Sequence, residues 1–178
     1  MQRRGTVAKR FEDDINTDYI IPAYLLQESW DKQFFADHAF EGYDQTFGTA
    51  CRANRESIVV AGNNFGCGSS REQAVYAIKY NNVVAVVAQS FPDIFFRNCL
   101  NNGLLPIQVA DTSGISIGDE LVVDLDSRTL SDRTTGVDYP IIATDAAIEQ
   151  MKRGGFLGVV RERLRQKLKA QSMRASSQ

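Results

Sequence analysis

The sequence has few of the residues on which most catalytic and metal-binding sites rely. It contains one histidine, His38, and three widely separated cysteines, Cys51, Cys67 and Cys99, among 178 residues. An odd number of distant cysteines fits neither a disulfide scaffold nor the close cysteine pairs of zinc and iron–sulfur sites, so we expect no metal site on this chain. A single histidine also weakens any Ser–His–Asp proposal. Acid–base chemistry here would need an unusual group or a second chain.

Long apolar runs and charge of one sign are missing as well. No run approaches the roughly 20 apolar residues that span a bilayer, and Lys9 and Arg10 interrupt any signal-peptide core. The net charge is −2, with both signs scattered, which argues against a nucleic-acid footprint. The one basic amphipathic run, residues 159–170, could seek a membrane or a nucleic acid, but a solvated surface helix is the simpler interpretation. We expect a cytoplasmic protein with one domain over residues 1–170 and a disordered tail over 171–178.

The most informative stretch is residues 62–72, GNNFGCGSSRE, which follows an apolar run and leads into a helical pattern. Three glycines allow positive φ and a close approach of the backbone to a ligand. A helix that begins near Ser69 would direct its unpaired N–H groups at the turn, and Arg71 adds a fixed charge that suits a carboxylate. The pattern therefore predicts an anion site.

Two simpler interpretations apply to the same residues. Ser69 and Glu72 have the spacing of a capping box, which needs no function. Cys67 lies inside the turn, where a helix N-terminus can lower a thiol pKa, so a thiol nucleophile or sensor is an alternative. Neither alternative requires three glycines, a second serine and an arginine at one helix end. The phosphate-loop and dinucleotide-binding patterns are absent.

Hydrophobic periodicity gives the remaining elements. We expect strands over 5–11, 58–61, 83–88, 104–109, 120–126 and 137–142. We expect helices over 31–40, 70–80, 90–102 and 144–153, and a long loop over 41–55. The β-branched run 83–88 is typical of a strand buried on both faces, and the strand–helix alternation around it indicates parallel pairing. The fold class is therefore α/β, with a curled mixed sheet that is parallel in its centre and flanked by helices.

Four ordered motifs resemble a known family. They are residues 14–22 (DINTDYIIP), 62–72 (GNNFGCGSSRE), 90–98 (SFPDIFFRN) and 102–106 (NGLLP). In this order and spacing they resemble the small subunits of 3-isopropylmalate dehydratases, in which the barrel-like swivel domain of the aconitase family is a separate chain. The resemblance covers residues 5–165.

The resemblance implies a hydro-lyase that moves a hydroxyl between neighbouring carbons of a hydroxy diacid by dehydration and rehydration. It implies a large-subunit partner, in a heterodimer or heterotetramer, that carries a [4Fe–4S] cluster. Ser69 matches the serine that takes a proton from carbon, Arg71 the arginine that binds a substrate carboxylate, and Ser70 a neighbouring substrate contact. Asp18 matches an acid that faces the same site.

The substrate is the least determined part of this hypothesis. Leu26, in the segment YLLQ, matches the position at which an arginine accompanies homoaconitate and an apolar residue accompanies isopropylmalate, so leucine biosynthesis is favoured. Citraconate, methylmalate and homoaconitate remain alternatives, as does a non-catalytic anion-binding module. Trp30 stands where true aconitases carry a substrate-binding arginine, which argues against citrate. Gln73 replaces a histidine that is common in the family.

Overall fold

The computed structural model describes residues 1–156, 158, 160, 164 and 165. Among these residues the strands are β1 (Gln2–Arg10), β2 (Ser57–Val60), β3 (Val83–Ala88), β4 (Leu105–Gln108), β5 (Glu120–Asp124), β6 (Thr129–Asp132) and β7 (Asp138–Pro140). The helices are α1 (Thr17–Ile20), the 3-10 helix η1 (Ala23–Gln27), α2 (Lys32–Asp37), α3 (Phe47–Arg52), α4 (Glu72–Lys79), α5 (Asp93–Asn102) and α6 (Asp145–Lys152). Most of the expected helix over 159–170 lies outside the described residues. The expected tail over 171–178 lies entirely outside them.

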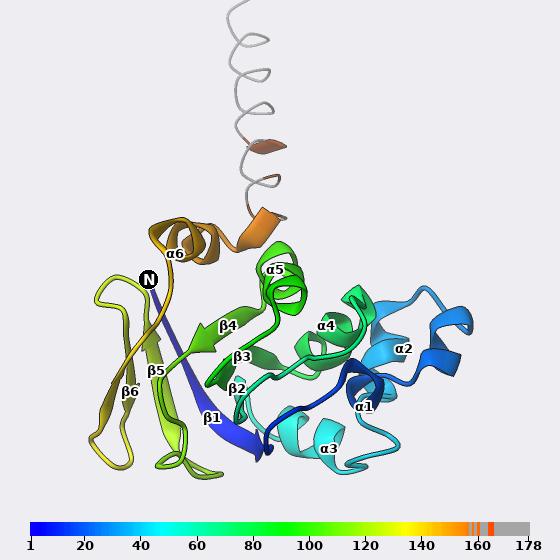
Figure 1. Ribbon diagram of the computed structural model, residues 1–178, viewed down its shortest axis with the longest axis horizontal. Helices are drawn as coiled ribbons and strands as arrows, with labels where there is room; N and C mark the ends of the chain where they lie inside the picture. Colours follow the sequence, from blue (N-terminus) through cyan, green and yellow to red (C-terminus); the bar gives the residue numbers. More distant parts are fainter. Residues whose placement is uncertain (157, 159, 161–163, 166–178) are drawn as a thin grey trace, which may run out of the picture.

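All seven strands form one mixed sheet with the order β4-β3-β2-β1-β5-β6-β7. Strands β1 to β4 pair in parallel, and β5, β6 and β7 continue the sheet in antiparallel pairs. Figure 1 shows the two halves at an angle, so that the sheet curls into a half-barrel. The predicted α/β class, with a curled mixed sheet and a parallel centre, is confirmed.

Two apolar clusters hold the helices on the sheet, and alternate side chains of the same strands enter each cluster. Val59 and Val86 face the cluster under α2, α3, α4 and α5, together with Phe11, Phe40 and Phe65. The other faces of β2 and β3 enter a second cluster with the antiparallel strands and α6. A strand that is buried on both faces has an almost continuous apolar sequence, which is why 83–88 was recognisable. This double burial fixes the ends of β2 and β3 in space.

Helix α3 corrects the loop that we expected over residues 41–55. Its residues Phe47 and Cys51 are one turn apart, and both are fully buried. Helices this short are stabilised by packing rather than by intrinsic propensity. The neighbouring glycine and threonine residues hid the amphipathic pattern in the sequence.

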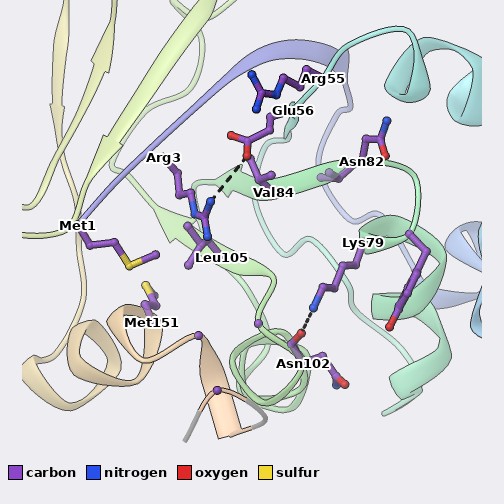
Figure 2. Close-up of a pocket in the computed structure, with 15 residues that line it drawn as sticks. Met1, Arg3, Arg55, Glu56, Lys79, Asn82, Val84, Asn102, Leu105 and Met151 are labelled. Atoms are coloured by element: carbon purple, nitrogen blue, oxygen red, sulfur yellow. Dashed lines mark hydrogen bonds and ion pairs between the residues drawn. The ribbon is translucent and has the colours of Figure 1, made fainter. Parts of the chain in front are cut away.

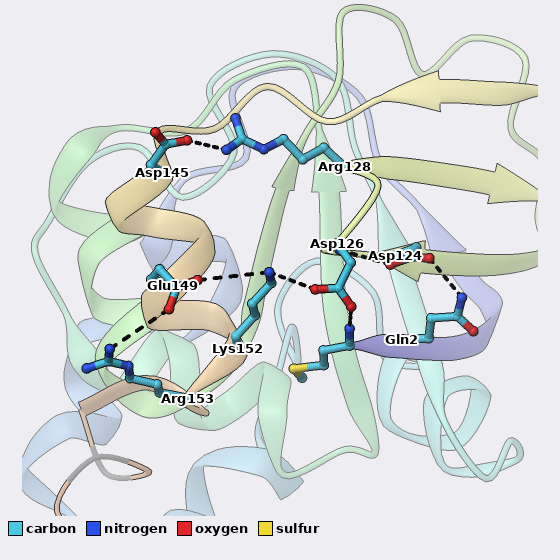
Figure 3. A network of polar contacts seen from close by, with 9 residues as sticks. Gln2, Asp124, Asp126, Arg128, Asp145, Glu149, Lys152 and Arg153 are labelled. Atoms are coloured by element: carbon cyan, nitrogen blue, oxygen red, sulfur yellow. Dashed lines mark hydrogen bonds and ion pairs between the residues drawn. The ribbon is translucent and has the colours of Figure 1, made fainter.

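Helix α6 is fastened to the antiparallel half by a network of charged groups (Figure 3). Thr144 caps the helix as expected, since its hydroxyl accepts a hydrogen bond from the Ala147 N–H. The Lys152 ammonium lies 2.7 Å from Asp126, which also contacts the amino group of Met1. Hydrogen bonds from Lys152 and from that amino group lower the pKa of Asp126 to about 2. In the described part of the chain, no helix is long and apolar enough to cross a membrane.

Candidate active site

The glycine-rich turn follows β2 at the carboxyl end of the parallel strands, where it lies against the segment between β1 and α1. The hydrogen bonds between the two segments run from Asp14 N to Asn63 O (2.9 Å), from Gly66 N to Ile15 O (2.8 Å) and from Thr17 N to Cys67 O (2.8 Å). The carboxylate of Asp13 also accepts a bond from Asn63 N at 2.6 Å. Two motifs about 50 residues apart in sequence thus form one unit.

Two of the glycines are required by the turn itself. Gly66 and Gly68 have φ angles of +86° and +91°. A Cβ on Gly66 would lie 2.2 Å from the ring of Phe95, and a Cβ on Gly68 would lie 2.5 Å from the amide of Asn16. Both residues therefore need the conformational freedom of glycine and its lack of a side chain. The groups that approach the backbone closely here belong to the protein itself, and the expected approach to a ligand stays a prediction.

Ser69 is exposed, and its backbone is held from outside the turn. The buried hydroxyl of Thr17 accepts a hydrogen bond from Ser69 N and donates one to Ser69 O, both at 3.1 Å. The helix α4 starts only at Glu72, with Arg71 at the N-cap position and no side-chain cap bond. The expected helix start near Ser69 and the Ser69–Glu72 capping box are therefore wrong. The side chain of Glu72 instead accepts a bond from Asn102 at 2.7 Å.

Ser70 is the next exposed residue of the turn, and its carbonyl accepts a hydrogen bond from the side chain of Asn98 at 3.2 Å. Asn98 belongs to α5, which packs against the same end of the sheet. The backbone of each serine is thus tied to a separate helix, while both side chains face solvent. Two serine hydroxyls are therefore open to a ligand, on a backbone that hydrogen bonds hold in place.

Arg71 links the turn to the first motif. Its side chain is only 14% exposed, and Nη1 forms an ion pair with Asp18 and donates to Ile21 O at 3.3 Å. Both contacts use the same nitrogen, so they fix one edge of the guanidinium. The structure places Asp18 in contact with Arg71, next to Ser69 and Ser70 in the turn, and the roles of these four residues toward a substrate stay predictions.

Leu26 lies on η1, which follows directly after the Ile21–Pro22 step. Its side chain is partly buried and packs against the first apolar cluster. Trp30, three residues beyond the end of η1, is 90% exposed. The contact of Leu26 with a substrate stays a prediction.

The three cysteines are free thiols, and Cys51 and Cys99 are buried. Burial raises the pKa of the Cys67 thiol, and the nearby charge of Asp14 raises it further. This is the opposite of the shift that a thiolate nucleophile needs. In the same part of the chain, no group of three or more His, Cys, Asp and Glu residues is placed to hold a metal ion.

A hollow of about 430 Å³ lies at the opposite edge of the parallel strands (Figure 2). Its walls include Val83 and Leu105, which begin β3 and β4, and the basic residues Arg3, Arg55 and Lys79. None of the predicted site residues lines it. The predicted site residues at the carboxyl edge instead present two exposed serines beside a guanidinium that is paired with Asp18, an arrangement that suits an anionic ligand.

Sequence reasoning missed Thr17 and Asn98 as supports of the two serines. Both residues lie inside motifs that the sequence analysis selected, but the sequence did not reveal which residues they contact. The partner of each is far away along the chain, and only the fold brings them together.

Comparisons with known proteins agree with these motifs. Residues 1–112 match the Aconitase C-terminal domain family. The chain is 40% identical over 151 residues to 3-isopropylmalate dehydratase small subunit 1 of Archaeoglobus fulgidus, which covers 84% of this chain and 92% of that protein. It is 39% identical over 170 residues to the 3-isopropylmalate dehydratase small subunit of Aquifex aeolicus, with 94% and 99% covered. A methanogen homoaconitase small subunit from Methanocaldococcus jannaschii is 40% identical over 156 residues, with 82% and 89% covered.

The fold comparison gives the same result. A crystal structure of 3-isopropylmalate dehydratase from Methanocaldococcus jannaschii matches with a TM-score of 0.82 and 36% identity, covering 96% of this chain and 99% of that chain. Sequence and fold agree over nearly the whole length. The chain therefore belongs to the family of 3-isopropylmalate dehydratase small subunits, which share the C-terminal swivel domain of aconitase.

Proposed function

We propose that this chain is the small subunit of a hydro-lyase that interconverts 2-isopropylmalate and 3-isopropylmalate in leucine biosynthesis, in the cytoplasm. One observation carries the proposal: an exposed Ser69-Ser70 pair is held beside Arg71, which is in turn paired with Asp18. The similarity to small subunits of this enzyme supports it. The partner is a large subunit, in a heterodimer or heterotetramer.

In this proposal Ser69 takes the proton from the substrate carbon. A free serine hydroxyl is too weakly acidic to form an alkoxide unaided. The positive charge of Arg71, two residues along the chain, would stabilise that alkoxide, by about 3 kcal/mol if it acts as a well-placed donor. The exposed hydroxyl therefore becomes a base only when another surface excludes water from it.

Arg71 and Ser70 bind the substrate in the same account. Arg71 would hold a carboxylate through the edge of its guanidinium that is not turned to Asp18, and Asp18 orients that guanidinium. Ser70 would donate a hydrogen bond to the same ligand. These contacts place the substrate's C–H beside Ser69, which converts a bimolecular proton transfer into one within a complex.

The residues of this chain do not fit an iron–sulfur cluster, because Cys51 and Cys99 are buried and Cys67 stands apart from them. We therefore assign the [4Fe–4S] cluster of the family to the large subunit. When bound there, it would supply the Lewis acid for the hydroxyl that leaves. Residues 68–71 would complete that site from the other side.

The substrate choice rests on Leu26. An apolar side chain there suits an isopropyl group, and discrimination by such a contact amounts to about 1–3 kcal/mol. Because a homoaconitase small subunit and two dehydratase small subunits show nearly equal identity to the chain, overall similarity does not rank the substrates. Citraconate or methylmalate, with a smaller methyl group, and homoaconitate are the alternatives within the same reaction.

The test is turnover by the chain mixed anaerobically with the iron–sulfur large subunit of the same genome. We expect 3-isopropylmalate to be converted by the mixture and by neither chain alone. Turnover of citraconate or homoaconitate instead would keep the mechanism and contradict the role of Leu26. No turnover of any of these diacids would contradict the proposed function.

Leu26→Arg sharpens the substrate test. A charged side chain at this position should lower kcat/KM for 3-isopropylmalate by about 10- to 200-fold, because the apolar contact is lost. Leu26→Met, which keeps the apolar character and nearly the volume, is the matched control and should stay close to wild type. An unchanged kcat/KM in Leu26→Arg would show that Leu26 does not contact the substrate.

A further inference from the structure

Thr17 is unusual because its fully buried hydroxyl forms both of its hydrogen bonds with the backbone of one exposed residue, Ser69. Its side chain is 0% exposed. Its Oγ1 accepts a hydrogen bond from Ser69 N and donates one to Ser69 O, each at 3.1 Å. The backbone N–H of Thr17 donates to Cys67 O at 2.8 Å. One residue thus holds the turn at two points on either side of Gly68.

The helix that follows Ser69, α4, does not hold the Ser69 backbone in this way. Because α4 begins at Glu72, Ser69 lies outside the helical hydrogen-bond ladder. Within its own turn, Arg71 N donates to Ser69 O at 2.9 Å. Among the described residues, the other hydrogen bonds to the Ser69 backbone come from Thr17. The position of the Ser69 side chain relative to the sheet therefore depends on Thr17.

The same short helix also holds Arg71. Thr17 and Asp18 are consecutive residues at the start of α1; Thr17 binds Ser69, and Asp18 forms the ion pair with Arg71. Asn16 fixes the start of this helix, since its side chain accepts a bond from Asp18 N at 2.9 Å. Two neighbouring residues of α1 thus set the spacing between Ser69 and Arg71.

We propose that Thr17 is a positioning residue for the reaction, which holds Ser69 at a fixed distance from Arg71. This inference rests on the proposed function, in which Ser69 accepts the proton and Arg71 binds the carboxylate. A displaced Ser69 would leave substrate binding by Arg71 nearly intact and would slow the proton transfer. The expected signature is a loss in kcat with little change in KM.

The simpler role for Thr17 is to satisfy the two backbone groups of Ser69, which would affect folding alone. Thr17→Val removes the hydroxyl and keeps the shape of the side chain, whereas Thr17→Ser keeps the hydroxyl and removes a methyl group. Thr112 offers a matched control, because it is 1% exposed and its hydroxyl donates to Ala61 O at 3.0 Å. Thr112→Val removes the same kind of bond from a buried threonine that holds neither Ser69 nor Arg71.

The experiment measures kcat, KM and thermal stability of each variant in complex with the large subunit. We expect Thr17→Val to lower kcat by about 10- to 100-fold, the effect of a misplacement near 1 Å. We expect KM to change by less than about threefold, and Thr17→Ser to recover kcat to within about threefold of wild type. Thr112→Val should lose no more stability than Thr17→Val, because it removes one hydrogen bond where Thr17→Val removes two, and it should keep the wild-type kcat.

Three results would overturn the inference. One is a wild-type kcat in Thr17→Val; another is an equal loss of kcat in Thr17→Ser and Thr17→Val, which would assign the effect to shape. The third is a loss of kcat in Thr112→Val as large as that in Thr17→Val.

If Thr17→Val does not fold, Thr17→Cys replaces it, because a thiol of similar size is a weak hydrogen-bond donor. A wild-type kcat in Thr17→Cys would also overturn the inference. Failure of the proposed function is distinguishable, because the wild-type mixture itself would then be inactive.

Discussion

The two edges of the parallel strands carry different kinds of surface. At the carboxyl edge, Ser69, Ser70 and Asp18 are exposed on turns whose backbones are tied together by hydrogen bonds. At the amino edge, basic side chains line a hollow of about 430 Å³ (Figure 2), and the charged network around Asp126 lies beside it (Figure 3). In the described part of the chain, the exposed serines of the carboxyl edge stand on a turn that hydrogen bonds tie to α1 and α5.

This difference shows why the hollow at the amino edge is not the proposed site. In open α/β sheets ligands bind outside the carboxyl ends of the strands, where turns direct backbone N–H groups outward. Charged side chains are paired at both edges, with Arg3 and Glu56 at 3.7 Å and Lys152 and Asp126 at 2.7 Å at the amino edge. The Arg71–Asp18 pair of the carboxyl edge differs in lying next to two exposed serines. We therefore expect changes at the carboxyl edge to alter turnover, and changes at the amino edge to alter stability.

The largest expected effect is that of Ser69→Ala. Loss of a proton-accepting group should lower kcat by about 10³-fold or more, within the range for acid–base groups. Because Ser69 forms no cap with α4, the thermal midpoint should stay within a few degrees of wild type. A stability loss of about 1 kcal/mol with normal turnover would instead indicate a structural role.

Arg71→Ala should have the next largest effect. Removal of a charged carboxylate contact should reduce kcat/KM by about 10²-fold, which corresponds to roughly 2.7 kcal/mol. Arg55→Ala removes an exposed arginine from the amino edge and is the matched control. A similar loss in both variants would contradict the division between the two edges.

Gly66→Ala tests the rigid support of the turn. The added Cβ would overlap the Phe95 ring at 2.2 Å and would sit on a backbone with φ of +86°, so we expect a loss of about 1–3 kcal/mol from crowding beyond the backbone strain. Gly118→Ala carries a φ of +95° in open space and isolates the backbone strain. Denaturant unfolding of the two variants measures the difference, and equal losses would show that Phe95 moves aside.

The smallest expected effect is the pH dependence supplied by Asp126. Its pKa is held at about 2 by the hydrogen bond from Lys152 and then by that from the Met1 amino group, against about 3.9 in an unfolded chain. The folded state favours the carboxylate, so this contribution is present above about pH 4 and is lost as the pH falls toward about 2. Asp126→Asn should flatten the stability curve in that window and leave turnover at neutral pH unchanged. An unaltered curve would contradict the lowered pKa.

The central strands and helices were predictable because their signals are local. The β-branched run 83–88 is β3, and the Pro92 and Gly103 boundaries enclose α5, with Gly103 at a φ of +69°. Two apolar faces and a left-handed stop residue can be recognised without knowledge of the fold. The roles of Ser69, Ser70, Arg71 and Asp18 come instead from the resemblance of their motifs to the family, and those roles stay predictions.

The start of α4 and the support of Ser69 could not be predicted, because they depend on contacts between distant segments. The Ser69–Glu72 spacing fits a local cap, but Thr17 engages both backbone groups of Ser69 from 52 positions away. Helix α3 was not predicted for a related reason, since its stability comes from burying Phe47 and Cys51 against other elements. Tertiary contacts overrode the local patterns in both places.

The measurement that tests the divided site most directly is a competition titration. The Ser69→Ala chain is added in increasing ratio to the wild-type chain, at a fixed and limiting amount of the large subunit, with 3-isopropylmalate as substrate. The account predicts that activity falls in proportion to the fraction of Ser69→Ala chain, because the variant folds and binds the partner but does not transfer the proton. Activity that stays constant across the titration, together with full turnover by the Ser69→Ala complex alone, would contradict the assignment of the reaction to this edge.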